Sequence, residues 1–227
     1  MDDSRAAPAS VLDIFNPFGA PVYYRETVTS TMDEARFLAA EGAVSGTVMA
    51  AGYQRAGRGR AGRLWNMGRK ESLPFTLILR YPAVTAIPQC LTLRTGLAVS
   101  LAIEDFVEAV IPSAVPAGRV QVKWPNDIML IQKDGYGKKA AGILAEATGF
   151  AGDSGGMVYL GIGINVAQKG FPPELEKKAC SIAGTLYPER SGLAALAAAA
   201  CRAVLAENRF ILLEKILARL YAELEVS

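Results

Sequence analysis

The sequence predicts an α+β protein in which helices back one mixed β-sheet. Hydrophobic residues make up 51% and charged residues 20% of the 227 positions, which is enough to bury one large core and to solvate its outside. Short strand-like segments joined by turns stand beside a few helical segments, without the regular strand–helix alternation of a parallel sheet. We expect residues 1–20, rich in Ala, Pro and Ser, to form a flexible lead-in and residues 21–227 to form a single domain.

The first half of this domain is expected to combine three strands with one helix. A short strand at 22–24 precedes a helix over 29–42, where Ser30 supplies an N-cap and a glycine ends the pattern. The β-branched and apolar runs 46–54 and 73–81 predict two buried strands. A loop rich in glycine and arginine lies between these two strands.

The second half is expected to hold a long buried helix, four strands and a helical end. Leucines at every fourth position, with apolar neighbours, predict the helix over 91–110. The strands are predicted at 120–124, 127–131, 140–148 and 157–166, and the dipeptide Asp134-Gly135 favours a hairpin turn between the second and the third. The Ala-rich segment from residue 192 onward predicts helices.

Composition excludes several kinds of active site. The chain contains no histidine, which rules out Ser-His-Asp and Cys-His triads and leaves metal binding to carboxylates, the ligands of hard ions such as Mg²⁺. The three cysteines, Cys90, Cys180 and Cys201, form no CxxC pair, so neither a disulfide framework nor a zinc cluster is expected. Cysteine usage of this kind favours a reducing compartment, and we expect a cytoplasmic protein.

Positive charge is local rather than general. The net charge of +2 gives weak long-range attraction to nucleic acid, so DNA is not an expected partner. The N-terminus lacks a signal-peptide pattern and the Ala-rich run 193–201 is too short to span a bilayer, so no membrane is expected either. Lysines and arginines instead crowd into residues 55–70, with no acidic residue among them. This window is the candidate anion site.

The stretch AGRGRAGRLW, residues 56–65, is the centre of that window. Gly57, Gly59 and Gly62 fit the G-x-G-x-x-G spacing of dinucleotide-binding loops, but they lead into a strand and no acidic residue follows at the required distance. Flexible RNA-binding segments usually occur as repeats, and a solvated surface loop is the plain alternative. We favour a clamp for a small-molecule phosphate, because glycines let the backbone close on a ligand while arginines bind phosphate through two nitrogens.

Four motifs, in their order along the chain, resemble the catalytic domain of biotin protein ligases: YQRAGRGRAGRLW, VKWPNDIML, KKAAGILAEATG and LGIGINV. The resemblance covers approximately residues 24–166. It implies the biotin/lipoate ligase fold, a mixed sheet backed by helices, and a reaction in two steps. Biotin and MgATP would give biotinyl-5′-AMP and pyrophosphate, and a lysine of a carrier domain would then take the biotin. ATP, Mg²⁺ and biotin are the ligands that the resemblance implies, and a biotin carboxyl carrier domain of a biotin-dependent carboxylase is the implied partner.

The resemblance also implies roles for individual residues. Lys139 and Arg60 would place positive charge where the biotin carboxylate meets the α-phosphate of ATP, and Asp127 would orient the acceptor lysine and is a candidate ligand for Mg²⁺. The residues expected to contact biotin are Ser30, Thr31, Met32, Gln54, Gly57, Arg58, Gly59, Arg60, Lys139 and Gly142. Those expected to contact ATP and its phosphates are Arg58, Arg60, Arg63, Trp65, Lys123, Asn126 and Asn165.

Plainer roles stay open for several of these residues. Ser30 is also an ordinary N-cap, and Asn126 and Asp127 form an ordinary turn start. Gly161 and Gly163 of the GIGIN motif either allow a nucleotide to approach the strand or make room for a neighbouring side chain. The residues alone do not decide between these roles.

The chain departs from the pattern of the biotin protein ligases at two places. Many relatives have Asn after the Ser-Thr pair, where this chain has Met32, so apolar packing is expected to replace one polar contact to biotin. We also expect neither a DNA-binding domain before the catalytic domain nor a small β-rich domain after it. Two alternatives share the motifs: a lipoate or octanoate ligase of the same fold, and a module that binds biotin or its adenylate without transferring it. The sequence leaves open whether the chain forms a homodimer.

Overall fold

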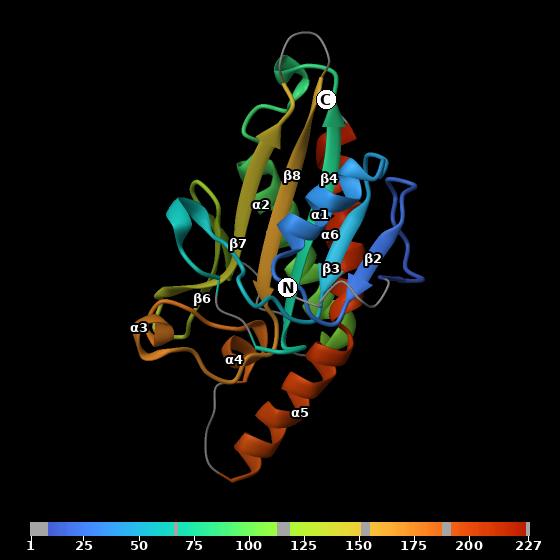
Figure 1. The fold of residues 1–227 in the computed structure, drawn as a ribbon. Helices are drawn as coiled ribbons and strands as arrows, with labels where there is room; N and C mark the ends of the chain where they lie inside the picture. The colour runs from blue at the N-terminus through green and yellow to red at the C-terminus, as the bar shows by residue number, and fades with distance from the viewer. Residues whose placement is uncertain (1–8, 66–67, 113–118, 151–154, 188–191, 226–227) are drawn as a thin grey trace.

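The protein is described by a computed structural model, which defines residues 9–65, 68–112, 119–150, 155–187 and 192–225 (Figure 1). Its strands form one eight-stranded sheet in the order β1-β2-β3-β4-β8-β7-β6-β5. The strands are β1 (Ser10–Val11), β2 (Val22–Arg25), β3 (Val48–Ala51), β4 (Ser72–Tyr81), β5 (Val120–Lys123), β6 (Asp127–Ile131), β7 (Gly137–Thr148) and β8 (Gly156–Asn165). Only β2 and β3 pair in parallel, and the other neighbours are antiparallel. The predicted mixed sheet is confirmed.

The helices cover the two faces of this sheet unequally. They are α1 (Thr31–Ala40), α2 (Leu91–Val110), α3 (Pro173–Glu176), α4 (Ile182–Leu186), α5 (Leu193–Glu207) and α6 (Arg209–Glu225), with short 3-10 turns at η2 (Arg60–Gly62) and η3 (Val84–Ala86). Figure 1 shows α2 and α6 together behind the sheet and α1 alone in front. Helices therefore cover less of the front face than of the back.

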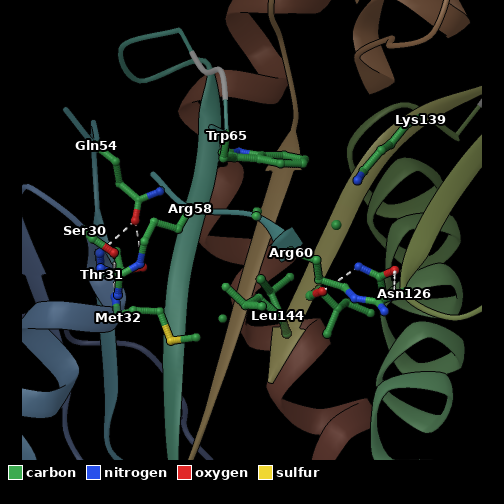
Figure 2. Close-up of a pocket in the computed structure, with 16 residues that line it drawn as sticks. Ser30, Thr31, Met32, Gln54, Arg58, Arg60, Trp65, Asn126, Lys139 and Leu144 are labelled. Atoms are coloured by element: carbon green, nitrogen blue, oxygen red, sulfur yellow. Dashed lines mark hydrogen bonds between the residues drawn. The ribbon is translucent and has the colours of Figure 1, made fainter. Parts of the chain in front are cut away.

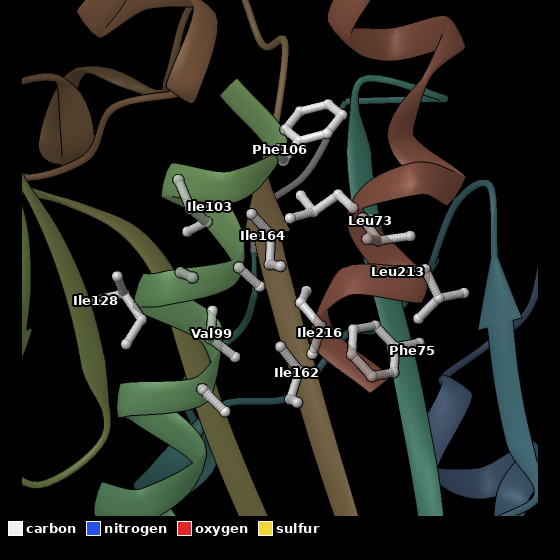
Figure 3. Packing of buried hydrophobic residues seen from close by; sticks show 14 of the residues in the cluster. Leu73, Phe75, Val99, Ile103, Phe106, Ile128, Ile162, Ile164, Leu213 and Ile216 are labelled. Carbon is white, nitrogen blue, oxygen red and sulfur yellow. The ribbon is translucent and has the colours of Figure 1, made fainter. Parts of the chain in front are cut away.

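The main core lies between the sheet and the helices α2 and α6. Figure 3 shows Val99 and Ile103 of α2 and Ile216 of α6 against Phe75 and Ile162 of the sheet. By length and composition the segment 84–110 is apolar enough to cross a membrane, but its helix α2 packs its apolar face into this core, as core helices of globular proteins do. Two long helices thus hold the central strands β4 and β8 rigidly from behind.

A second, smaller core lies under α1 on the front face. It contains Met32 and Ala35 of α1, with Met49, Ile78 and Tyr159 of the strands. The N-cap prediction is confirmed here, because Ser30 has extended backbone angles and its Oγ accepts a hydrogen bond from the backbone N–H of Met32 at 3.3 Å. The cap fixes the first turn of α1 beside the central strands.

Part of the segment predicted as a flexible lead-in is fastened to the domain. Ser10 and Val11 pair with β2, and the side-chain amide of Asn16 donates to the carbonyls of Ala20, at 2.7 Å, and Gly46, at 3.0 Å. These hydrogen bonds give residues 9–20 a defined path. Residues 1–8 lie outside the described part of the chain. The predicted hairpin between β6 and β7 is confirmed, with Gly135 at a φ of 83° in its turn.

Candidate active site

The front face of the sheet holds a pocket between α1, the arginine loop and the strands β7 and β8 (Figure 2). The structure brings eleven of the predicted site residues together in its lining: Ser30, Thr31, Met32, Gln54, Arg58, Gly59, Arg60, Trp65, Asn126, Lys139 and Gly142. They come from five separate stretches of the chain. Their convergence on one pocket is the main structural support for a common site.

One end of the pocket is polar and already organised. Gln54 Oε1 accepts hydrogen bonds from the backbone N–H of Thr31, at 2.7 Å, and from its hydroxyl, at 3.0 Å. The hydroxyl of Thr31 in turn accepts one from Thr76 Oγ1 at 3.0 Å. Ser30, Thr31 and Gln54 are all buried, so these groups hold fixed positions in a medium of low polarity, where directed hydrogen bonds discriminate strongly between ligands.

Beside this polar end the floor of the pocket is apolar. Met32 is 4% exposed, and a Cβ added to Gly161 would lie 3.4 Å from its Cε, so the thioether lies against β8. Leu144 of β7 lines the same region, and Figure 2 shows Met32 and Leu144 approaching each other across the floor. The Met32 position thus contributes apolar packing, as the sequence indicates, in a space suited to an aliphatic chain or ring.

The arginine loop is a small hairpin that crosses the pocket. The backbone N–H of Trp65 donates to Gly57 O at 2.8 Å, the N–H of Gly59 donates to Arg63 O at 2.7 Å, and Arg58 forms a bridge with Leu64. Its two inner arginines reach opposite walls, as Figure 2 shows. Arg58 makes an ion pair with Asp33 of α1, whereas Arg60 Nη1 donates to Asn126 Oδ1 at 3.0 Å.

Trp65 closes the floor where the loop leaves the pocket. Its indole lies flat on two glycines: a Cβ on Gly163 would come within 2.7 Å of Trp65 Nε1, and one on Gly142 within 2.9 Å of its ring. Gly163 therefore makes room for a neighbouring side chain, one of the two roles considered for the GIGIN glycines. The face of the indole also receives Lys139, whose Nζ lies 5.3 Å from the ring centroid.

A β-bulge places Lys139 in the pocket. Two consecutive residues of β6 pair with Ala141 and Lys139 of β7, so Ala140 is an extra residue in the strand. One extra residue reverses the alternation of side chains, which brings Lys139 to the same face as Gly142. There the ammonium group pairs with Asp127, with 2.6 Å between Lys139 Nζ and Asp127 Oδ1.

The turn between β5 and β6 is held against this strand. Asn126 Nδ2 donates to the carbonyl of Ile143 at 2.9 Å, and the N–H of Ile143 donates back to Asn126 O at 2.9 Å. Asn126 Oδ1 remains available for Arg60, as described above. The amide of Asn126 therefore couples β7 to the tip of the arginine loop.

Comparison with known families shows to which family the chain belongs. The model of the biotin/lipoate A/B protein ligase family matches residues 22–165. The chain belongs to this family. Every residue that lines the pocket lies within the matched range.

Curated members of the family are similar to this chain over part of their length. The bifunctional ligase/repressor BirA of Bacillus spizizenii is 36% identical over 167 residues, which are 72% of this chain and 46% of that protein. A biotin--[acetyl-CoA-carboxylase] ligase of Mycobacterium tuberculosis is 36% identical over 159 residues, which are 69% of this chain and 53% of that protein. The chain thus spans about half the length of these relatives.

Solved structures of the family share the fold. The biotin protein ligase of Aquifex aeolicus in complex with biotin and ATP aligns with a TM-score of 0.59 at 25% identity, over 90% of this chain and 70% of that one. The biotin protein ligase of Leishmania major in complex with biotin aligns with a TM-score of 0.57 at 26% identity, over 86% of this chain and 79% of that one. The biotin/lipoate ligase fold is therefore confirmed.

Five residues expected at the site lie outside the pocket lining. Gly57 lies under Gln54, since a Cβ there would meet Gln54 Nε2 at 2.7 Å, and Asp127 contacts the pocket through Lys139. Arg63 and Lys123 are exposed. Asn165 is 3% exposed at the end of β8, where its Nδ2 donates to Cys180 O at 3.1 Å. For these five, direct ligand contact stays a prediction.

The pocket also includes residues that the sequence did not single out as ligand contacts. They are Ile143, Leu144, Gly161, Ile162 and Gly163, all on the central strands β7 and β8. All five belong to the AGIL and GIGIN motifs, so the motifs marked the right strands. Only the pairing of the strands showed which residues face the pocket.

No group of three or more Cys, Asp or Glu side chains is close enough to hold a metal ion within the described residues. Asp127, the predicted Mg²⁺ ligand, already forms an ion pair with the ammonium group of Lys139. Mg²⁺ is commonly held through one or two carboxylates together with substrate phosphates. The residues present therefore fit an ion that arrives with a nucleotide, and not one held by the protein alone.

Proposed function

We propose that this chain is a biotin protein ligase, which joins biotin to AMP and then transfers it to a lysine of a biotin carboxyl carrier domain. The observation that carries the proposal is the order of groups along one pocket. A hydrogen-bonding end at Thr31 and Gln54 is followed by an apolar floor and then by the cations Arg60 and Lys139. Biotin has the same order of ureido group, thioether ring and alkyl chain, and carboxylate. The names of the relatives and the ligands in their structures agree with it.

With biotin bound in this order, the polar end of the pocket would bind the ureido group and the apolar floor would bind the rings. Thr31 is held by Gln54, so its hydroxyl and the neighbouring Ser30 present fixed hydrogen-bonding groups. Met32 and Leu144 would cover the ring and the alkyl chain. The alkyl chain then directs the carboxylate toward Lys139, under the arginine loop.

The first chemical step is disfavoured by charge. A carboxylate oxygen must attack the α-phosphorus of ATP, with departure of pyrophosphate, and two unit charges about 4 Å apart repel by roughly 1–4 kcal/mol. Lys139 and Arg60 converge on this end of the pocket from β7 and from the loop. Fixed cations at the reacting atoms stabilise the charge that develops there, because no solvent has to reorganise.

The second step needs an uncharged amine. The acceptor lysine nitrogen attacks the carbonyl carbon of the mixed anhydride, the bond to the phosphate oxygen breaks, and AMP leaves. Asp127 Oδ1 lies 2.6 Å from Lys139 Nζ, and Asp127 stands beside the pocket rather than in its lining. An amine that enters from outside would therefore meet this carboxylate, which would accept a hydrogen bond from the amine and take its proton. Lys139 would hold the phosphate oxygen during both steps.

The nucleotide would occupy the space between the loop and the end of β8. Asn126 lines this side of the pocket, and the buried Oδ1 of Asn165 has no hydrogen-bond partner within the described part of the chain, so it offers an acceptor to a base. Mg²⁺ would enter with the phosphates of ATP and offset their charge, with Asp127 as the candidate protein ligand. A cytoplasmic location is part of the proposal, and three free cysteines support it, because thiols stay reduced in that compartment.

A competition among acids tests the substrate. The protein is incubated with ATP, Mg²⁺ and equal amounts of biotin, lipoate and octanoate, and adenylates and pyrophosphate are measured by mass spectrometry and a coupled assay. Biotinyl-AMP is the expected main product. Lipoyl-AMP or octanoyl-AMP as main product would support the other ligase class of this fold, and biotin binding without pyrophosphate release would support a non-transferring binding module.

A further inference from the structure

Asp33 lies outside the pocket and has no role in the chemistry proposed above, yet both of its carboxylate oxygens contact the arginine loop. Arg58 Nη2 donates to Asp33 Oδ1 at 2.7 Å and Arg58 Nη1 donates to Asp33 Oδ2 at 3.2 Å. Two parallel hydrogen bonds between a guanidinium and a carboxylate fix both distance and orientation. The loop is thereby attached to the first turn of α1.

Asp33 is itself held in position by contacts with residues outside the loop. Arg36, one turn along α1, lies 3.4 Å from Asp33 Oδ1 and also pairs with Glu146 of β7. The same guanidinium lies over the ring of Tyr159, 5.6 Å from its centroid. Asp33 is therefore an anchored carboxylate, whereas Arg58 belongs to a glycine-rich segment held mainly by a few hairpin hydrogen bonds.

The geometry points to Asp33 as a positioning residue that latches the arginine loop closed through Arg58. Arg58 and Arg60 are two residues apart and reach opposite walls, so the two contacts together span the pocket (Figure 2). The Arg60 contact must change when phosphate is present, because Arg60 is the cation proposed to bind it. The Arg58 contact lies on the α1 side, away from Lys139, and we assign the Arg58 guanidinium to Asp33 in the loaded protein as well, in place of the contact with phosphate that the sequence suggested.

The latch has two measurable consequences. In the free protein it protects the hairpin amides of Gly59 and Trp65, which bond to Arg63 O and Gly57 O. In the loaded protein it delays escape of the reactive adenylate, and this second consequence rests on the proposed function. An exposed ion pair of this kind changes an opening equilibrium by up to about fivefold.

The test compares Asp33→Asn with a matched control, Asp105→Asn. Asp105 pairs with Arg219 at 2.7 Å, and the side chains are 34% and 43% exposed, against 34% and 38% for Asp33 and Arg58. Asparagine keeps the shape of the carboxylate, and Asp33→Glu restores the charge. We expect amide exchange across residues 56–65 of the free protein to be about fivefold faster in Asp33→Asn, near the parent rate in Asp33→Glu, and unchanged in Asp105→Asn.

Ionic strength separates a latch from a loss of structure. Salt screens an exposed ion pair such as that of Asp33 with Arg58. The amide exchange rate of the parent should therefore rise toward that of Asp33→Asn as the salt concentration reaches about 0.5 M, while the rate of the variant should change little. The same proteins, given biotin and ATP and then an unrelated lysine-rich protein, should show about fivefold more stray biotinylation for Asp33→Asn. Equal exchange in parent and Asp33→Asn, or faster exchange without faster escape of adenylate, would overturn the latch. A parent that makes no adenylate would overturn the proposed function, and amide exchange would still decide the latch.

Discussion

Lys139 Nζ lies 2.6 Å from Asp127 Oδ1. This ion pair joins the strands β6 and β7 at the edge of the pocket. The side chains are 33% and 27% exposed, so both partners can reach a ligand without breaking the sheet. The pair brings together a cation that the proposed reaction needs from the first step onward and a carboxylate that acts mainly in the second step. Substitution of either partner alone should therefore affect different steps.

Lys139→Ala should prevent formation of the adenylate. The substitution removes the cation that faces the two reacting anions, and loss of one such group typically lowers the rate about 100-fold or more. The measurement is pyrophosphate release in a single turnover with biotin and ATP. Lys139→Arg is the companion variant, because it keeps the charge and should retain more activity than the alanine variant. Release at the parent rate in Lys139→Ala would remove Lys139 from the chemistry.

Asp127→Asn should slow the second step much more than the first, in which Asp127 would be one ligand of a Mg²⁺ ion held mainly by the phosphates of ATP. Asparagine still fills the space beside Lys139 but takes no proton from an amine, and loss of a general base commonly costs about 100-fold. Adenylate should accumulate in the absence of a carrier domain, while transfer to the carrier lysine should become slow. A higher pH, which deprotonates the amine without help, should recover part of the transfer rate. Equal slowing of both steps would contradict this division.

Arg60→Gly should loosen the hold on the adenylate more than its formation. The substitution removes the hydrogen bond to Asn126 and one cation from the phosphate end of the pocket. Adenylate should dissociate sooner and label exposed lysines of a bystander protein. Arg69→Gly is the natural comparison, since Arg69 lies in the same cationic window but is exposed and is neither in the pocket lining nor an expected ligand contact. Stray labelling no greater than in the parent would contradict this role of Arg60.

Gly163→Ala should displace Trp65. The new methyl would lie 2.7 Å from Trp65 Nε1, a contact that a packed site cannot absorb without movement and that costs about 1–3 kcal/mol. We expect weaker binding of biotin and ATP by calorimetry and a red shift of tryptophan fluorescence. Gly170→Ala is a suitable control, because nothing lies within 4 Å of a Cβ at that position. Unchanged emission and affinity would show that the indole does not depend on this glycine.

The cysteines should differ in reactivity. Burial raises the pKa of Cys180 and of Cys201 to about 11, whereas Cys90 is exposed. Ellman's reagent at pH 8 should titrate one thiol quickly and the other two only after unfolding. The folded state keeps the two buried thiols protonated after those of the unfolded chain have ionised. Stability should therefore fall as the pH rises from about 9 to 11, which a series of urea unfolding curves would show.

Much of this protein can be predicted from short stretches of its sequence. The N-cap at Ser30, the helix over Leu91–Val110 and the turn at Gly135 depend on neighbours in the chain, and all are confirmed. The glycines and arginines of the loop indicate an anion site because their chemistry is local. The order of the four motifs then points to the family. The path of residues 9–20 was less predictable, since Asn16 is fixed by contacts to distant backbone.

Tertiary structure alone decided which charged groups face one another. The face occupied by Lys139 depends on the extra residue Ala140 in β7, and a bulge appears only when two strands are paired in register. The contact of Arg58 with Asp33 joins residues 25 positions apart, and that of Arg60 with Asn126 joins residues 66 apart. Side chains in a strand change face with every residue, so a shift of one position reverses what meets the pocket. Sequence motifs therefore name the groups that can react, and strand register decides which of them meet.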